Sequence, residues 1–155
     1  MPKRLCLSLL LVFGTLIANA QEAGDVLVPL GESTRLRAEI TAGAMNVSGL
    51  MVVRRVDGEW RGSVVNEFGV RAFDFTLSAD RRKVRVLNAI GPLRRRMVRR
   101  TLQNDLAFLF GARGEAEKKG TRTAEKAGNA YRLTNARRGI TYVFSEISEA
   151  NEMAQ

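Results

Sequence analysis

Between residues 34 and 90, apolar and polar residues alternate in short runs, which is typical of β-strands with one buried and one wet face. Two such runs, residues 45–56 and 59–68, flank Asp57-Gly58. An Asp-Gly pair in this position favours a two-residue hairpin loop, because both loop residues adopt positive φ angles. The pattern therefore predicts an antiparallel hairpin in which Val56 pairs with Glu59.

The hairpin register fixes which side chains share a face of the sheet. One face is largely apolar and contains the pairs Met51–Val64, Val53–Gly62 and Arg55–Trp60. We expect the Arg55 guanidinium to lie on the Trp60 ring. The other face places Arg54 opposite Arg61, and like charges in that arrangement repel. These two arginines are therefore expected to be solvated or bound to an anion.

Further strands follow the hairpin. Residues 70–77 alternate, with Phe73, Phe75 and Leu77 on one side, and residues 83–87 alternate with Val84 and Val86 between charged residues. Short turns between such segments predict an antiparallel meander. Gly69 suits a bulge or tight bend between two of the strands. Two more strands are predicted at residues 130–134 and 140–146, whereas the charged segment 112–129 is predicted to be a mobile loop.

The hydrophobic period changes from two to about 3.6 at Pro92, which predicts a helix over residues 92–110. Pro92 suits the first helical turn and Gly111 suits the end. The apolar positions of this segment are Leu93, Met97, Val98, Leu102, Leu106 and Leu109.

Together these elements predict a mainly β, α+β fold: a curved antiparallel sheet or half-barrel whose apolar concave face is covered by one long amphipathic helix. The interior is either an ordinary packed core or a cavity for an apolar ligand. The candidate ligand-binding residues are Met51, Val53, Trp60, Val64, Phe73, Phe75, Val84, Met97, Leu102 and Leu106.

A group of arginines surrounds the start of the predicted helix: Arg94, Arg95, Arg96, Arg99 and Arg100. Cations near a helix N-terminus oppose the helix dipole, at a cost of a few tenths of a kcal/mol each. Two interpretations are open. The group is either a solvated basic face or a surface that docks to an anionic membrane.

The first twenty residues have the order of a secretory signal peptide. Lys3 and Arg4 precede an apolar run of about thirteen residues, which is short of the roughly twenty needed to span a membrane. Ala18-Asn19-Ala20 then offers a cleavage site. The predicted organisation is a signal peptide at residues 1–20, one β-rich domain at 21–147 and a disordered tail at 148–155. The predicted location is the periplasm, with association with the outer membrane left open.

Composition narrows the chemistry further. The chain has no histidine, and its one cysteine, Cys6, would leave with the signal peptide. Disulfides, thiol or histidine metal sites and nucleophile–histidine catalytic sets are then excluded from the exported domain. We predict no enzyme, no catalytic residue, no metal and no cofactor. The formal charge of +9 favours anionic partners, and export argues against nucleic acid.

Two polar residues fall within the apolar pattern, Asn66 in a strand and Asp105 in the helix. A buried Asp must be paired or hydrogen-bonded. Three roles are open for these residues: a structural tie between helix and sheet, a polar contact to a ligand headgroup, or a catalytic carboxylate.

Several stretches carry a resemblance to a known family: Gly49-Leu50, Trp60-Arg61-Gly62-Ser63, Asn66-Glu67-Phe68-Gly69 and Phe73-Asp74-Phe75. With the signal peptide and the sheet–helix–strand order, the chain resembles small exported proteins of the LolA/LolB-like type. The resemblance implies a half-barrel closed by helices that carries acyl groups of lipoproteins between bacterial membranes. The expected partners are an acyl chain or lipoprotein, and an anionic membrane surface or envelope protein.

Overall fold

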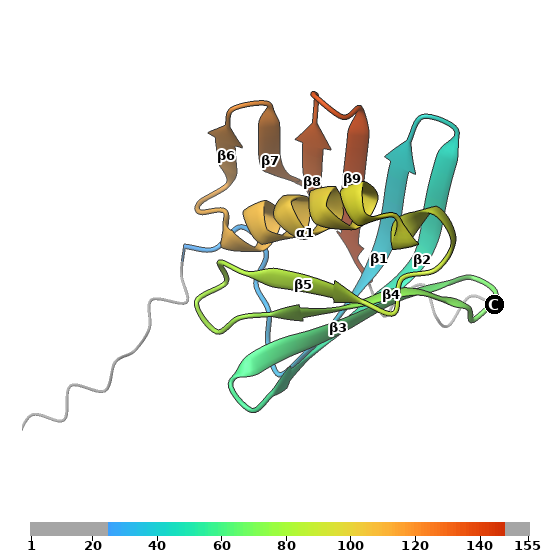
Figure 1. Ribbon diagram of the computed structural model, residues 1–155. Coiled ribbons are helices and arrows are strands. Elements are labelled where there is room, and N and C mark those ends of the chain that lie inside the picture. Colours follow the sequence, from blue (N-terminus) through green and yellow to red (C-terminus); the bar gives the residue numbers. More distant parts are fainter. Residues whose placement is uncertain (1–24, 148–155) are drawn as a thin grey trace, which may run out of the picture.

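Residues 25–147 are described by a computed structural model, in which nine strands form one curved sheet and one α-helix crosses its concave side (Figure 1). The predicted signal peptide and the predicted tail from residue 148 lie outside the described residues. The strands are β1 (Ser33–Ala42), β2 (Met45–Val56), β3 (Glu59–Asn66), β4 (Arg71–Leu77), β5 (Val84–Leu87), β6 (Ala116–Lys119), β7 (Arg122–Ala127), β8 (Ala130–Asn135) and β9 (Ile140–Glu146). The helices are the 3₁₀-helix η1 (Gly91–Arg94) and α1 (Arg96–Gly111).

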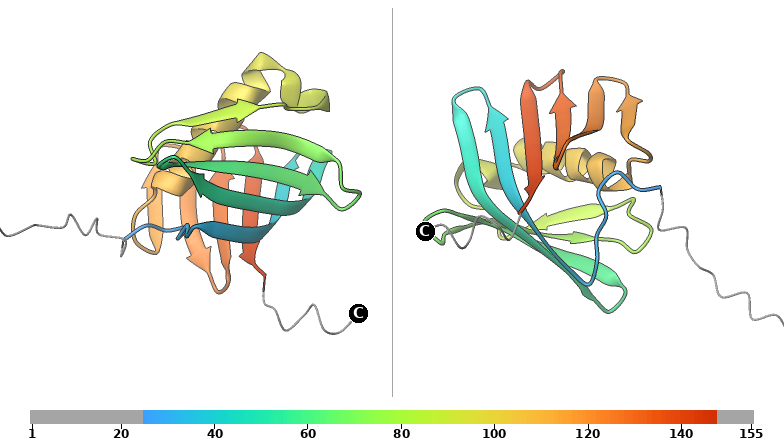
Figure 2. Two further views of the ribbon diagram at one scale, coloured as in Figure 1. Left: turned by 90° about the horizontal axis from the view of Figure 1, so that it is seen from below. Right: turned by 180° about the vertical axis from the view of Figure 1, so that it is seen from behind.

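The strands lie side by side in the order β5-β4-β3-β2-β1-β9-β8-β7-β6, and every neighbouring pair is antiparallel. The sheet curls strongly but does not close, so β5 and β6 remain edges (Figure 2). This confirms the predicted fold class, a half-barrel-like sheet covered by a helix.

The central hairpin has the predicted register. Val56 pairs with Glu59, and the loop residues Asp57 and Gly58 have φ angles of 53° and 82°. The guanidinium carbon of Arg55 lies 5.3 Å from the centre of the Trp60 ring. The two-residue loop therefore sets the faces of β2 and β3 as expected.

The predicted helix over residues 92–110 is wrong in one respect, because it is two helices. The 3₁₀-helix η1 contains Pro92 and buries Leu93. Arg95 then adopts an extended conformation (φ −60°, ψ 129°) and separates η1 from α1. Helical periodicity consequently does not run from Leu93 into α1.

The predicted loop at residues 112–129 is also wrong, because most of it forms the hairpin β6–β7. Ala124 is the residue of these two strands that is fully buried, and β6 is an exposed edge strand. Gly120, with a φ angle of 61°, lies in the turn. A short, polar, edge hairpin shows no apolar alternation, so its sequence resembles a loop.

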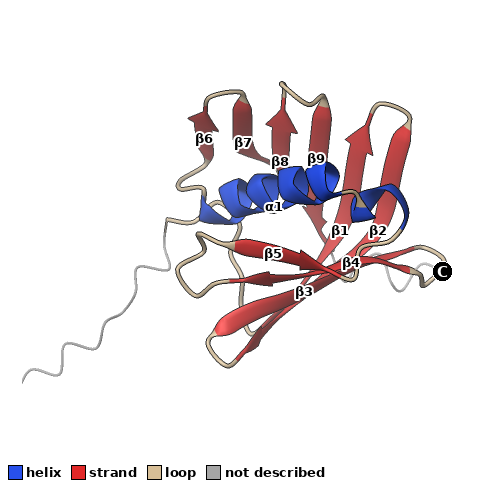
Figure 3. Ribbon diagram, in the orientation of Figure 1, coloured by secondary structure: helices blue, strands red, loops and turns tan. Residues whose placement is uncertain are grey.

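The helix α1 closes the opening between the two ends of the sheet. It packs against β5 at one edge and against β7 and β8 near the other (Figure 3). Its buried residues Leu102, Leu106, Leu109 and Phe110 point into the same core as the concave face of the sheet. The side chain of Gln103 also accepts a hydrogen bond of 3.0 Å from the backbone N–H of Val86 on edge strand β5.

Candidate functional site

The space between α1 and the sheet is filled by side chains. Nine of the ten predicted ligand-binding residues lie together in this core: Met51, Val53, Trp60, Val64, Phe73, Phe75, Val84, Leu102 and Leu106. Four of them, on β2, β3 and β4, have no surface that water can reach. In this state the concave face is a packed core, and an apolar ligand would enter only if α1 moved.

Met97, the tenth predicted residue, does not line the core. Its side chain is 65% exposed, and it lies on the outer side of α1. The break at Arg95 changes the helical phase, so residues four apart across it, such as Leu93 and Met97, no longer share a face.

Asp105 forms the main polar contact beneath α1, and its side chain is completely buried. Its Oδ1 accepts hydrogen bonds from Arg122 Nε (2.6 Å) and Asn135 Nδ2 (2.9 Å), and its Oδ2 accepts one from the Tyr142 hydroxyl (2.8 Å). Burial and the neighbouring Asp105 charge raise the pKa of Tyr142, which keeps the phenol protonated as a donor. These contacts join α1 to β7, β8 and β9. They correspond to the first of the predicted roles, a structural tie between helix and sheet.

Asn66, the other polar residue in the apolar pattern, has a local role. Its side-chain oxygen accepts hydrogen bonds from the backbone N–H groups of Phe68 and Val70. These bonds hold the turn between β3 and β4, where Gly69 has a φ angle of 75°. Asn66 is therefore not a contact between helix and sheet.

The C-terminal end of α1 is held by a second set of contacts. The buried Arg81 guanidinium donates to the carbonyl oxygens of Val28 (2.7 Å) and Phe110 (3.5 Å). The backbone N–H of Leu27 donates to the carbonyl of Ala112 (2.9 Å). By contrast, the first five residues of α1 include none that is buried. The helix is thus fastened at its middle and C-terminal end, whereas its first five residues contribute only half-buried Val98 to the core.

The five predicted arginines are all exposed, and four of them line two different hollows beside α1. Arg94 and Arg99 line a depression beside Val86 and Asn88. Arg96 and Arg100 line a second groove, between α1 and the ends of β7 and β8. Within α1, Arg96, Arg99 and Arg100 are spaced three and four residues apart and so share one side of the helix, although they border different hollows.

The groove beside Arg96 and Arg100 contains three further arginines that the sequence did not single out: Arg122, Arg137 and Arg138. Arg122 begins β7, and the other two lie in the turn between β8 and β9. The adjacent Arg137-Arg138 pair was visible as a charge cluster. Its proximity to the helix depends on long-range strand pairing, which one sequence does not reveal.

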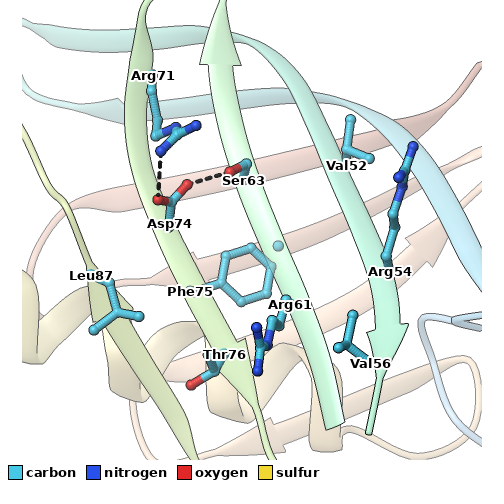
Figure 4. Close-up of a pocket in the computed structure, with 11 residues that line it drawn as sticks. Val52, Arg54, Val56, Arg61, Ser63, Arg71, Asp74, Phe75, Thr76 and Leu87 are labelled. Atoms are coloured by element: carbon cyan, nitrogen blue, oxygen red, sulfur yellow. Dashed lines mark hydrogen bonds and ion pairs between the residues drawn. The ribbon is translucent and has the colours of Figure 1, made fainter.

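A separate shallow groove of about 390 Å³ lies on the convex face of β2–β5 (Figure 4). Asp74 accepts hydrogen bonds there from Ser63, from Arg71 (3.1 Å) and from Asn88 (2.7 Å). Burial alone would raise the pKa of Asp74, but the hydrogen bonds from Asn88 and Ser63 and the Arg71 charge hold it below its usual value. These three hydrogen bonds use the carboxylate of Asp74 to join β3, β4 and the segment after β5, so its role is structural.

Within residues 25–147, no helix is both long and apolar enough to cross a membrane, and no three acidic, cysteine or histidine side chains gather as metal ligands. No protein-family model and no curated protein sequence matches this chain. The resemblance to the LolA/LolB-like family remains a prediction.

Proposed function

We propose that the protein is a non-enzymatic, exported lipid- or lipoprotein-binding protein of the periplasm that holds an acyl chain between the concave face of its sheet and α1. One observation carries the proposal: a large apolar sheet face is covered by one helix whose first five residues include none that is fully buried. The first turn of α1 can therefore move away from the sheet at a lower cost than the rest of the helix.

The energetics favour long chains. Exposing Leu102, Leu106 and Leu109 costs about 5–9 kcal/mol, at about 1.5–3 kcal/mol for each side chain. Burying a sixteen-carbon chain gains about 12 kcal/mol, at about 0.8 kcal/mol per methylene, whereas an eight-carbon chain gains only about 6 kcal/mol. The gain from palmitate exceeds this cost over its whole range, so palmitate should displace the leucines. The gain from octanoate only about equals the cost and leaves no surplus to break the Asp105 contacts of α1, so octanoate should not.

The test measures how much labelled palmitate stays with the protein through gel filtration. We expect retention of palmitate but not of octanoate. The variant Leu106→Ala, which removes core volume beneath α1, should change palmitate retention at least threefold. The matched control Leu87→Ala makes the same change on the convex face, where Leu87 is 41% exposed, and should have no effect. Equal effects of the two variants, or no retention by the unmodified protein, would rule out the proposal.

A second function is favoured by the exposed arginines at the start of α1: docking to an anionic membrane or an envelope partner. Basic side chains near an anionic surface contribute about 1 kcal/mol each at moderate salt. The protein should therefore sediment with vesicles containing phosphatidylglycerol but not with neutral vesicles. Replacing Arg94, Arg95 and Arg99 by Gln should weaken sedimentation, and 0.5 M NaCl should abolish it. Sedimentation that ignores both changes would exclude electrostatic docking.

A further inference from the structure

The groove on the β7–β8 side of α1 has an unusual concentration of one charge. We call it the basic groove and define it by Arg96, Arg100, Arg122, Arg137 and Arg138. Its volume is about 730 Å³, within the range of small-ligand sites. Among residues 25–147, the carboxylate that reaches one of these guanidinium groups within 4 Å is Asp105, which pairs with Arg122.

The surroundings add positive potential and neutral donors. The first turn of α1 has no acidic residue, and Arg95 provides no side-chain cap, so the positive end of the helix dipole is uncompensated there. Thr101, Asn104 and Thr121 also line the groove with groups that can donate hydrogen bonds.

Arg138 shows how incompletely these cations are satisfied. Its Nη1 donates toward the sulfur of exposed Met97 at 3.7 Å, and a thioether is a weak acceptor. A guanidinium that makes such a contact retains most of its capacity for an anionic partner. The backbone N–H of Arg138 donates a hydrogen bond of 3.3 Å to the side-chain oxygen of Asn135. This bond holds the β8–β9 turn beside the groove.

We propose that the basic groove binds a phosphate monoester group. The arginines that line it come from α1, β7 and the β8–β9 turn, so three separate elements place cations along one groove. Planar guanidinium forks pair bidentately with phosphate oxygens, and a tetrahedral dianion can accept several of them at once. A carboxylate has only two oxygens and one charge, which matches this arrangement less well.

Arg122 connects the groove to the cover of the concave face. Its Nε binds Asp105, and its side chain is 31% exposed. A phosphate group bound by Arg122 would compete with Asp105 for the same guanidinium and weaken the tie between α1 and β7. This coupling rests on the proposed function, in which an acyl chain binds beneath α1. Binding of the anionic headgroup in the basic groove would then loosen the helix that covers the acyl chain.

Calorimetric titration with glycerol 3-phosphate tests the site without any acyl chain. The double variant Arg137→Gln/Arg138→Gln should weaken binding at least tenfold. The matched control Arg94→Gln/Arg99→Gln removes the same charge from two arginines that do not line the groove, and it should weaken binding less than threefold. The double change of Arg137 and Arg138 to Lys keeps the charge but should still weaken binding about fivefold, because the forks are lost. Equal losses in the two glutamine variants, or no binding by the unmodified protein, would overturn the proposal.

Two further measurements identify the source of the phosphate and the coupling. Vesicles of phosphatidylcholine with phosphatidic acid should bind more tightly than vesicles with equally charged phosphatidylglycerol if the source is a lipid headgroup. Binding of glycerol 3-phosphate without that preference indicates a soluble ester. Saturating glycerol 3-phosphate should speed amide hydrogen exchange in α1 at least threefold, and unchanged exchange would overturn the coupling. If the protein binds glycerol 3-phosphate but does not retain palmitate, the proposed function is rejected, whereas the proposal that the basic groove binds a phosphate monoester still stands.

Discussion

Replacing Asp105 by Ala should destabilise the protein more than any other single change of a charged residue that we consider. The carboxylate is fully buried and joins three side chains, Arg122, Asn135 and Tyr142. Its removal leaves the Tyr142 hydroxyl and the Asn135 amide as buried donors without an acceptor, at about 1–3 kcal/mol each. Arg122 is partly exposed and can turn to water. The sum agrees with the about 3–5 kcal/mol typical of breaking a buried pair.

Urea unfolding followed by circular dichroism measures this loss of free energy directly, and thermal unfolding measures the matching decrease in melting temperature. For a domain of this size, about 1 kcal/mol corresponds to a melting-temperature change of about 4 °C, so we expect a decrease of about 12–20 °C.

Asp74→Ala is the matched control, because Asp74 also accepts hydrogen bonds from three side chains but its own side chain is 17% exposed. Water can replace its partners, so this change should cost only about 1 kcal/mol. If the two variants lose similar stability, the buried Asp105 cluster is not what fastens α1.

Three other predictions follow from single positions. Gly49→Ala should cost about 3 kcal/mol or more by urea unfolding, because its Cβ would lie 2.0 Å from the backbone oxygen of Val65; Gly31→Ala, with open space around it, should be neutral. Tyr142 has a raised pKa in the fold, so above about pH 10 only the unfolded state loses its proton and stability falls by about 1.4 kcal/mol per pH unit. Burial and the neighbouring Glu146 also raise the pKa of Tyr131, so Tyr142→Phe should remove only the Tyr142 part of the slope, and an unchanged slope would contradict the prediction. Asp74 has a lowered pKa, so the stability it adds relative to Asp74→Asn is full above about pH 4 and is lost as the pH falls further; a difference that is constant from pH 6 to 3 would be the contrary result.

Local rules were sufficient for the central part of the fold. The Asp57-Gly58 loop determines the register of β2 and β3, because a two-residue loop leaves no freedom in the pairing. The alternation in β4 and β5 identifies their buried face. These strands border the core, so their apolar pattern is strong.

The errors arose where burial is slight or where the helical phase changes. Strands β6 and β7 have one fully buried residue, Ala124, and gave no periodic signal. Met97 was placed in the core because its spacing continues that of Leu93, but the extended conformation of Arg95 breaks the phase.

The polar sites were predicted least well, since they join residues far apart in the chain. Asp105 was identified as needing a partner, but Arg122, Asn135 and Tyr142 follow it by 17, 30 and 37 positions. The basic groove likewise depends on strand pairing that brings the β8–β9 turn beside the start of α1. Pairing of this kind is a property of the whole sheet.

Quenching of Trp60 fluorescence by a brominated fatty acid tests most directly whether an acyl chain enters beneath α1. Trp60 is the single tryptophan of the chain, and it is 7% exposed on the concave face. Bromine quenches only on contact, so a chain that reaches the core must lower the emission. We predict saturable quenching by dibromostearate, faster in Asp105→Asn than in the unmodified protein and absent with dibromosuccinate. Emission that stays constant while dibromostearate is added would contradict the account.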